Sequence, residues 1–106
     1  MKNFNKYLNI SELEVNWGFY VTGTGFSKID IYQSYPDNAH HPKTHTFNWD
    51  KGRILNDYYL IFVPDGKGVF EMAGLPSFNI SAGDCFILYP GVWHRYKPDP
   101  NVGWIE

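Results

Sequence analysis

The chain has 106 residues and a net charge of −2, and its Lys and Arg residues are scattered along it. This length allows one hydrophobic core, and the absence of a basic cluster gives the chain alone no surface for nucleic acid. No apolar run approaches the roughly 18 residues that span a bilayer, and the first residues lack the apolar core of a signal peptide. We therefore expect a cytoplasmic domain with no membrane partner.

Aromatic residues make up 19% of the chain, and ten Gly and seven Pro interrupt it at short intervals. Aromatic runs bounded by Gly and Pro are typical of strands. No segment has the pattern of a helix longer than two turns. The composition predicts an all-β fold.

The first third of the chain predicts an arm followed by a hairpin. Residues 1–15 are polar with isolated apolar positions and are expected to form an N-terminal arm. Residues 17–22 have the composition of a strand, residues 23–25 that of a turn, and residues 26–32 alternate apolar and polar side chains. We expect the two strands to pair with each other.

The middle of the chain contains the strongest strand signal. Residues 34–52 are loop-like, apart from a brief alternating stretch at 44–49. Residues 53–63 predict a long strand. A turn predicted at 64–68 connects it to a second strand at 69–72.

Short strands and strong turns continue to the end. Residues 77–80 and the apolar run 86–89 are predicted strands, the second of them buried in the core. Strands at intervals of about 8 to 12 residues predict a sandwich or a barrel. Residues 102–106 look like the start of another strand. It indicates either a piece of a longer chain or a strand that pairs at an edge.

A Pro-Gly corner at Pro90 precedes four consecutive polar or amphipathic side chains, from Trp93 through His94 and Arg95 to Tyr96. Proline removes a backbone donor, so the preceding strand must stop or bulge there. The cluster is either an exposed loop or a group that faces a ligand.

Four histidines raise the question of a metal site, which needs three or four converging ligands. His40 and His41 are neighbours on a loop bounded by proline, so their side chains should diverge; His45 follows nearby and His94 stands apart. We expect solvated histidines rather than a metal centre.

Two further residues have more than one interpretation. Cys85, the single cysteine, lies beside an apolar run, and we expect it to pack in the core rather than act as a nucleophile. Arg53 follows Gly52 at the start of the strongest strand. Its guanidinium could donate two hydrogen bonds to a hydroxylated or anionic ligand, or it could be an exposed residue at a strand end.

Several motifs resemble those of the cupins, namely Gly66-Lys67-Gly68, Ile80 to Asp84, and Pro90 to His94. Residues 41–55 and 93–106 are more closely similar to the N-terminal, effector-sensing domain of AraC-family transcriptional regulators. The similarity covers residues 16–106. It implies a double-stranded β-helix (a jelly-roll barrel), a small-molecule pocket and a homodimer. It also implies a C-terminal helix-turn-helix domain outside these residues, through which alone DNA would be bound.

The same resemblance bears on metal binding. Metal-binding cupins place two histidines and a glutamate where this chain has Arg53, Leu55 and Tyr59, and only the fourth ligand matches, at His94. One imidazole cannot hold a catalytic metal against water. The resemblance thus implies no metal, no cofactor and no catalytic residue.

Our leading hypothesis is a sensor that binds a small hydroxylated effector, a sugar, inside the barrel. Two alternatives stay open: a metal-dependent cupin enzyme (an isomerase or an oxygenase), and a domain filled by its own aromatic side chains that serves only in dimerisation. The predicted ligand-binding residues are Arg53, Tyr59, Trp93, His94, Tyr96, Trp104 and Glu106.

Overall fold

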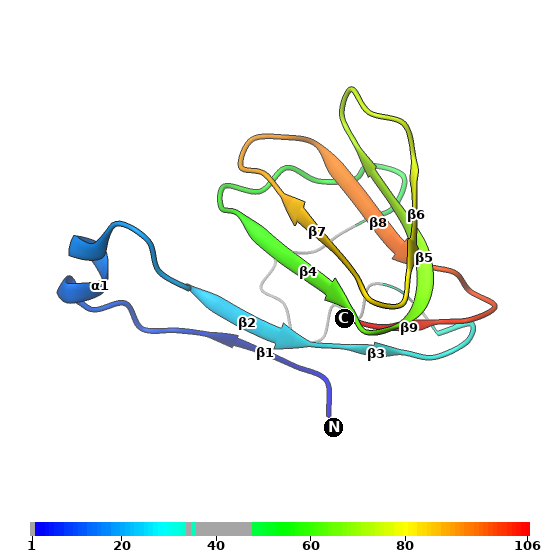
Figure 1. Ribbon diagram of the computed structural model, residues 1–106, viewed down its shortest axis with the longest axis horizontal. Coiled ribbons are helices and arrows are strands. Elements are labelled where there is room, and N and C mark those ends of the chain that lie inside the picture. Colours follow the sequence, from blue (N-terminus) through cyan, green and yellow to red (C-terminus); the bar gives the residue numbers. More distant parts are fainter. Residues whose placement is uncertain (1, 34, 36–47) are drawn as a thin grey trace.

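The chain folds mainly into strands, which curl into a half-barrel around an aromatic core (Figure 1). The computed structural model describes residues 2–33, 35 and 48–106. The all-β prediction is confirmed. In these residues the elements, in chain order, are β1 (Phe4–Tyr7), α1 (Glu12–Trp17), β2 (Gly23–Phe26), β3 (Lys28–Ile29), β4 (Tyr59–Val63), β5 (Asp65–Met72), β6 (Phe78–Ser81), β7 (Asp84–Leu88), β8 (His94–Pro98) and β9 (Trp104–Ile105).

Strand β5 is the centre of the main sheet, whose order is β3-β9-β5-β6, with β8 also paired to β5. The first residues of β5 pair with β9, and the rest lie between β6 and β8. The change of partner occurs at Gly66, which has a φ of 98°. A Cβ at Gly66 would overlap the carbonyl oxygen of Gly103, so only glycine fits there. The turn predicted at 64–68 is thus wrong, because the glycine bends a continuous strand.

Strands β4 and β7 form a second, two-stranded sheet. Its inner side chains, among them Phe86 and Leu88, are buried, and Phe86 stacks on Phe70 of β5 with ring centroids 4.5 Å apart. The core lies between the two sheets. Its buried apolar residues are Ile29, Leu55, Val63, Phe70, Ile80, Phe86, Leu88, Tyr96 and Trp104.

Alternation along β7 corrects two predictions. The run 86–89 is not buried throughout: Phe86 and Leu88 face the core, whereas Ile87 is exposed. Cys85 is also exposed, so its predicted place in the core is wrong. The reason is that the β4–β7 sheet has one face on the core, and successive strand residues point to opposite faces.

The predicted strand at 53–63 is shorter than expected, because β4 begins only at Tyr59. Arg53 instead forms an isolated bridge to His94. The stretch from His94 to Pro98, which the sequence left without a structure, is strand β8. The predicted strand at 44–49 lies mostly outside the described residues.

The N-terminal region departs most from its prediction. Residues 17–22 are not a strand: helix α1 occupies Glu12–Trp17, with Ser11 and Glu14 forming a capping box and Gly18 closing the helix with a φ of 78°. These capping signals outweigh the aromatic composition. The turn predicted at 23–25 is also wrong, because Gly23–Phe26 form strand β2, which pairs with β1 and replaces the expected pairing of residues 17–22 with 26–32. The β1–β2 hairpin extends from the half-barrel with α1 at its tip (Figure 1).

The last strand rules out one of its two interpretations, that of an edge strand. Strand β9 is between β3 and β5 rather than at an edge. Its Trp104 is buried, so the core holds it on one side while two strands hold its backbone. Among the described residues, no helix is long and apolar enough to cross a membrane.

Candidate functional site

Strand β8 separates two environments by simple alternation. His94 and Tyr96 are buried on the inner face, whereas Arg95 and Lys97 are partly exposed on the outer face. The backbones of His94 and Arg53 exchange two hydrogen bonds of 3.0 Å each. This pairing places Arg53 beside the inner residues of β8.

The side chain of Arg53 binds both inner residues of β8. Its Nε donates to Nε2 of His94 at 3.2 Å, and its Nη2 donates to the hydroxyl of Tyr96 at 2.8 Å. The guanidinium carbon also lies 5.5 Å from the centre of the Tyr96 ring. Three side chains from two distant segments are thus held in one geometry.

These contacts assign the protonation of His94. Because Nε2 accepts from Arg53, the ring proton belongs on Nδ1, which lies 3.3 Å from the carbonyl oxygen of Val92. Burial lowers the pKa of His94, and the nearby positive charge of Arg53 lowers it further. His94 is therefore a neutral imidazole whose Nε2 is already engaged.

A carboxyl, that of Glu106, also lies near Tyr96. The hydroxyl of Tyr35 donates to the two carboxyl oxygens of Glu106, at 3.1 and 3.2 Å. Burial raises the pKa of Glu106 to about 7, against the opposing effects of the Tyr35 hydrogen bond and the charge of Arg53. The carboxyl of Glu106 thus titrates near neutral pH.

Aromatic rings join the two halves of the site. The centroid of the Tyr96 ring lies 6.2 Å from that of Trp104 and 6.3 Å from that of Tyr35. Burial raises the pKa of the Tyr96 hydroxyl to about 12. The indole nitrogen of Trp104 is buried, and its interaction with the carboxyl of Glu106 lowers the pKa of that carboxyl against the effect of burial. We define the inner polar cluster by its six members, which are Tyr35, Arg53, His94, Tyr96, Trp104 and Glu106.

The inner polar cluster therefore brings together five predicted site residues. Tyr59 lies close by on β4 and is half-buried against the core. Burial raises the pKa of its hydroxyl, and the charge of Arg53 opposes that shift. Tyr35 is a member that the sequence did not suggest, because a single tyrosine in a loop-like stretch carries no signal. Arg53, Tyr35 and Glu106 are partly exposed, whereas His94, Tyr96 and Trp104 are buried.

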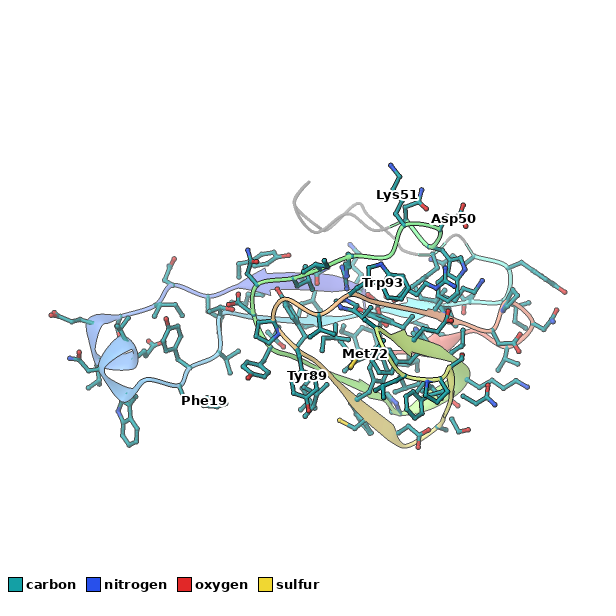
Figure 2. The ribbon with its side chains drawn as sticks, turned by 90° about the horizontal axis from the view of Figure 1, so that it is seen from above. Phe19, Asp50, Lys51, Met72, Tyr89 and Trp93 are labelled. Carbon is teal, nitrogen blue, oxygen red and sulfur yellow. The ribbon has the colours of Figure 1, made fainter. Side chains whose placement is uncertain are left out.

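Trp93 lies apart from the cluster. It precedes β8 on the face opposite to His94, and its indole nitrogen donates to the carbonyl oxygen of Lys51 at 2.8 Å. Figure 2 shows it beside the turn that carries Asp50 and Lys51. Strand alternation thus directs Trp93 to the outer surface.

The outer face of β8 anchors this turn. The guanidinium of Arg95 lies 4.2 Å from the centre of the Trp49 ring and the ammonium of Lys97 lies 4.1 Å from it. Arg95 also pairs with Glu71 at 2.7 Å. The turn leads directly into Arg53. The contacts of Arg95 and Lys97 with the turn therefore help to position the guanidinium of Arg53 on the inner face.

The metal hypothesis concerns the four histidines of the chain. His40, His41 and His45 lie outside the described residues, and within the described part of the chain no three His, Cys, Asp or Glu side chains gather as a metal site would require. The histidine that matches a cupin ligand, His94, accepts a hydrogen bond from Arg53 at the nitrogen that faces the cluster.

An open hollow of about 440 Å³ lies away from the inner polar cluster. It is lined by parts of β5, β6 and β8 together with the residues that follow β8, and it includes Lys67 and Asp99, which form an ion pair at 3.8 Å. None of the cluster residues lines it.

Comparison with known proteins gives one family and one relative. Residues 31–105 match the family described as the AraC-like ligand binding domain. Over 55 residues the chain is 38% identical to the raffinose operon transcriptional regulatory protein RafR of Pediococcus pentosaceus. The aligned region is 51% of this chain and 20% of that relative. No solved structure matches the chain.

Proposed function

Because the chain belongs to the family of AraC-like ligand-binding domains, we propose that its inner polar cluster binds a neutral sugar whose presence controls an attached DNA-binding domain. Membership of the family makes the chain an effector-binding domain of a transcriptional regulator rather than an enzyme. Residues 16–106 form the sensing domain in this proposal, with residues 1–15 as its arm.

The observation that carries the proposal is the mixture of groups in the cluster. Arg53 supplies a positive donor, the carboxyl of Glu106 supplies an acceptor, and the ring of Tyr96 lies near both of them. Sugar hydroxyls both donate and accept hydrogen bonds, and their C–H faces pack on aromatic rings. An alternation of polar ends around an aromatic wall suits such a ligand.

The charge of the cluster favours a neutral ligand. Arg53 is positive, His94 is neutral, and Glu106 is partly ionised near pH 7. An anionic ligand would meet the carboxylate, and a cationic ligand would meet the guanidinium. A hydroxylated ligand without charge satisfies both groups.

The relative supports the same ligand class. Its name connects it with a raffinose operon, and raffinose is a neutral oligosaccharide. The chain spans only a fifth of the length of that regulator, so the DNA contact is proposed to lie in a separate domain. We also propose that the protein acts as a homodimer, since a two-fold regulator matches two DNA half-sites.

Binding of sugars to the intact protein tests the proposal. Thermal-shift screening with raffinose, other neutral sugars and sugar phosphates should give stabilisation by a neutral sugar. Calorimetric titration should then show at least a tenfold loss of affinity for that sugar in Arg53→Ala. Lys6→Ala is the matched control, because it also removes a positive charge but at an exposed position on strand β1, outside the inner polar cluster.

Two results would contradict the proposal. One is an identified ligand whose affinity is the same in wild type and Arg53→Ala. The other is a clear preference for sugar phosphates over neutral sugars, which would show that the carboxyl of Glu106 does not face the ligand.

A further inference from the structure

The outer face of the β4–β7 sheet carries a continuous row of apolar side chains. In the register of the two strands Leu60 lies opposite Ile87, and Phe62 lies opposite Cys85. At one end the rings of Tyr58 and Tyr89 meet edge to face, with centroids 5.7 Å apart. We define the β4–β7 outer face by these side chains, which are Tyr58, Leu60, Phe62, Cys85, Ile87 and Tyr89.

This face is strongly exposed. Leu60 is 69% exposed, Tyr58 67% and Phe62 52%. Since a large aromatic side chain has about 150–250 Å² to bury, the whole face presents on the order of 500 Å² of mainly apolar surface. Apolar patches at the upper end of the usual range on a monomer mark interaction sites.

The face also lacks charge along both strands. Strand β4 has no ionisable side chain other than Tyr59, which points inward. Asp84 of β7 has the inward parity of Phe86 and accepts a hydrogen bond from the backbone of Ser81. Two identical copies of this face can therefore approach without like-charge repulsion.

We propose that a second copy of the chain covers the β4–β7 outer face, so that two such sheets pack face to face around a two-fold axis. Apolar sheets pack on one another in this way, about 10 Å apart. A face without charges offers nothing that would select a partner of different, charged chemistry, whereas it is complementary to itself. The inference rests on the dimer of the proposed function and adds the surface that forms it.

The area sets the strength of the dimer. Two copies would bury roughly 1,000 Å², just below the range of stable specific interfaces, so the dimer should dissociate at moderate dilution.

The inward side of β4 carries Tyr59, near Arg53. The same strand thus connects the dimer surface with the proposed effector site.

Sedimentation velocity of the intact protein over a dilution series tests the proposal. Leu60→Lys should weaken the dimer at least tenfold. Leu13→Lys is the matched control, because Leu13 is equally exposed (68%) but lies on helix α1. The control should dimerise as the wild type does, and neither variant should change the midpoint of thermal unfolding of the monomer.

The single cysteine provides a second measurement. Because Cys85 lies on the proposed interface and is exposed in the monomer, N-ethylmaleimide should alkylate it more slowly at concentrations where dimers form. In Leu60→Lys the alkylation rate should stay at the monomer value over the same concentrations.

Three results would overturn the proposal: equal dimerisation of Leu60→Lys and wild type, alkylation of Cys85 at one rate at every concentration, or protection of Cys85 in the monomer. The last would show that another segment of the protein covers the face. Sugar binding is measured separately, so failure of the effector proposal leaves these results interpretable.

Discussion

Replacing Glu106 by glutamine should remove a specific part of the pH dependence of folding. The carboxyl of Glu106 accepts hydrogen bonds from the Tyr35 hydroxyl and lies near Tyr96 and Trp104, and burial raises its pKa to about 7. In the unfolded chain the same carboxyl has an ordinary pKa near 4.5. Glutamine keeps an oxygen for the Tyr35 hydroxyl but carries no charge at any pH.

The sign of the effect follows from proton binding in the two states. Below pH 4.5 the carboxyl is protonated in both states, and its contribution to stability is fully present. Between pH 4.5 and 7 the unfolded chain releases a proton that the folded chain keeps, so stability falls as pH rises. Above pH 7 both states are ionised, and the loss is constant.

The size of the effect comes from the same two values. Their difference corresponds to roughly 3 kcal/mol at about 1.4 kcal/mol per pKa unit, and partial exposure of Glu106 reduces the expectation to about 2 kcal/mol. The free energy of unfolding of wild type minus that of Glu106→Gln should therefore decrease by about 2 kcal/mol from pH 4.5 to pH 8.

Urea denaturation followed by tryptophan fluorescence, at half-unit steps of pH, measures this difference. His94 titrates in both proteins, so its contribution cancels in the subtraction. Glu12→Gln, on the exposed helix α1, is the control and should follow the wild type. If the difference between wild type and Glu106→Gln does not change with pH, the carboxyl is not buried in the folded protein as described.

Two further predictions concern the backbone. Gly66→Ala should lower the free energy of unfolding, measured by urea denaturation, by roughly 3 kcal/mol or more, because the added Cβ would overlap Gly103 and Trp104 at a positive φ. Gly74→Ala, also at a positive φ but in open space, should lower it by about 1 kcal/mol. Equal losses in the two variants would contradict the close approach of β5 and β9. Ser11→Ala removes the cap of α1 and should weaken that helix by about 1 kcal/mol, seen as faster amide exchange in α1. The midpoint of global unfolding should not move, because α1 buries no residue; a lower midpoint would show that the helix packs on the core.

The sequence indicated those strands that are bounded by local turn signals. A tight turn separates the predicted strands 69–72 and 77–80, and they correspond to the end of β5 and, from Phe78 on, to β6. Pairings between distant segments, such as β3 with β9, left no local signal, because periodicity describes one strand and not its partner.

The errors arose where two local signals competed. Residues 17–22 are rich in aromatic side chains, but the capping residues Ser11 and Glu14 start a helix before them. Cys85 lies beside an apolar run, yet its position in the alternation of β7 exposes it. In both cases the composition was correct and the position of the residue decided its structure.

The candidate site could be predicted in part for a physical reason. The sequence indicated a cluster that contains His94 and Tyr96, and the resemblance to the AraC family added Arg53 from a distant segment. Strand β8, which the sequence did not indicate, directs His94 and Tyr96 to the same side because they are two residues apart. The same alternation separates Trp93 from them. Tyr35 reaches the site through a tertiary contact that no spacing in the sequence predicts.

The pairing of β3 with β9 bears on how the chain is made. Ile29 is almost fully buried, yet its strand pairs only with β9 among the described strands, and β9 leaves the ribosome long after β3. Until Trp104 has emerged, Ile29 and the backbone of β3 have no partner in the sheet. The half-barrel therefore closes late in synthesis, and chaperones or proteases have access to this segment until then.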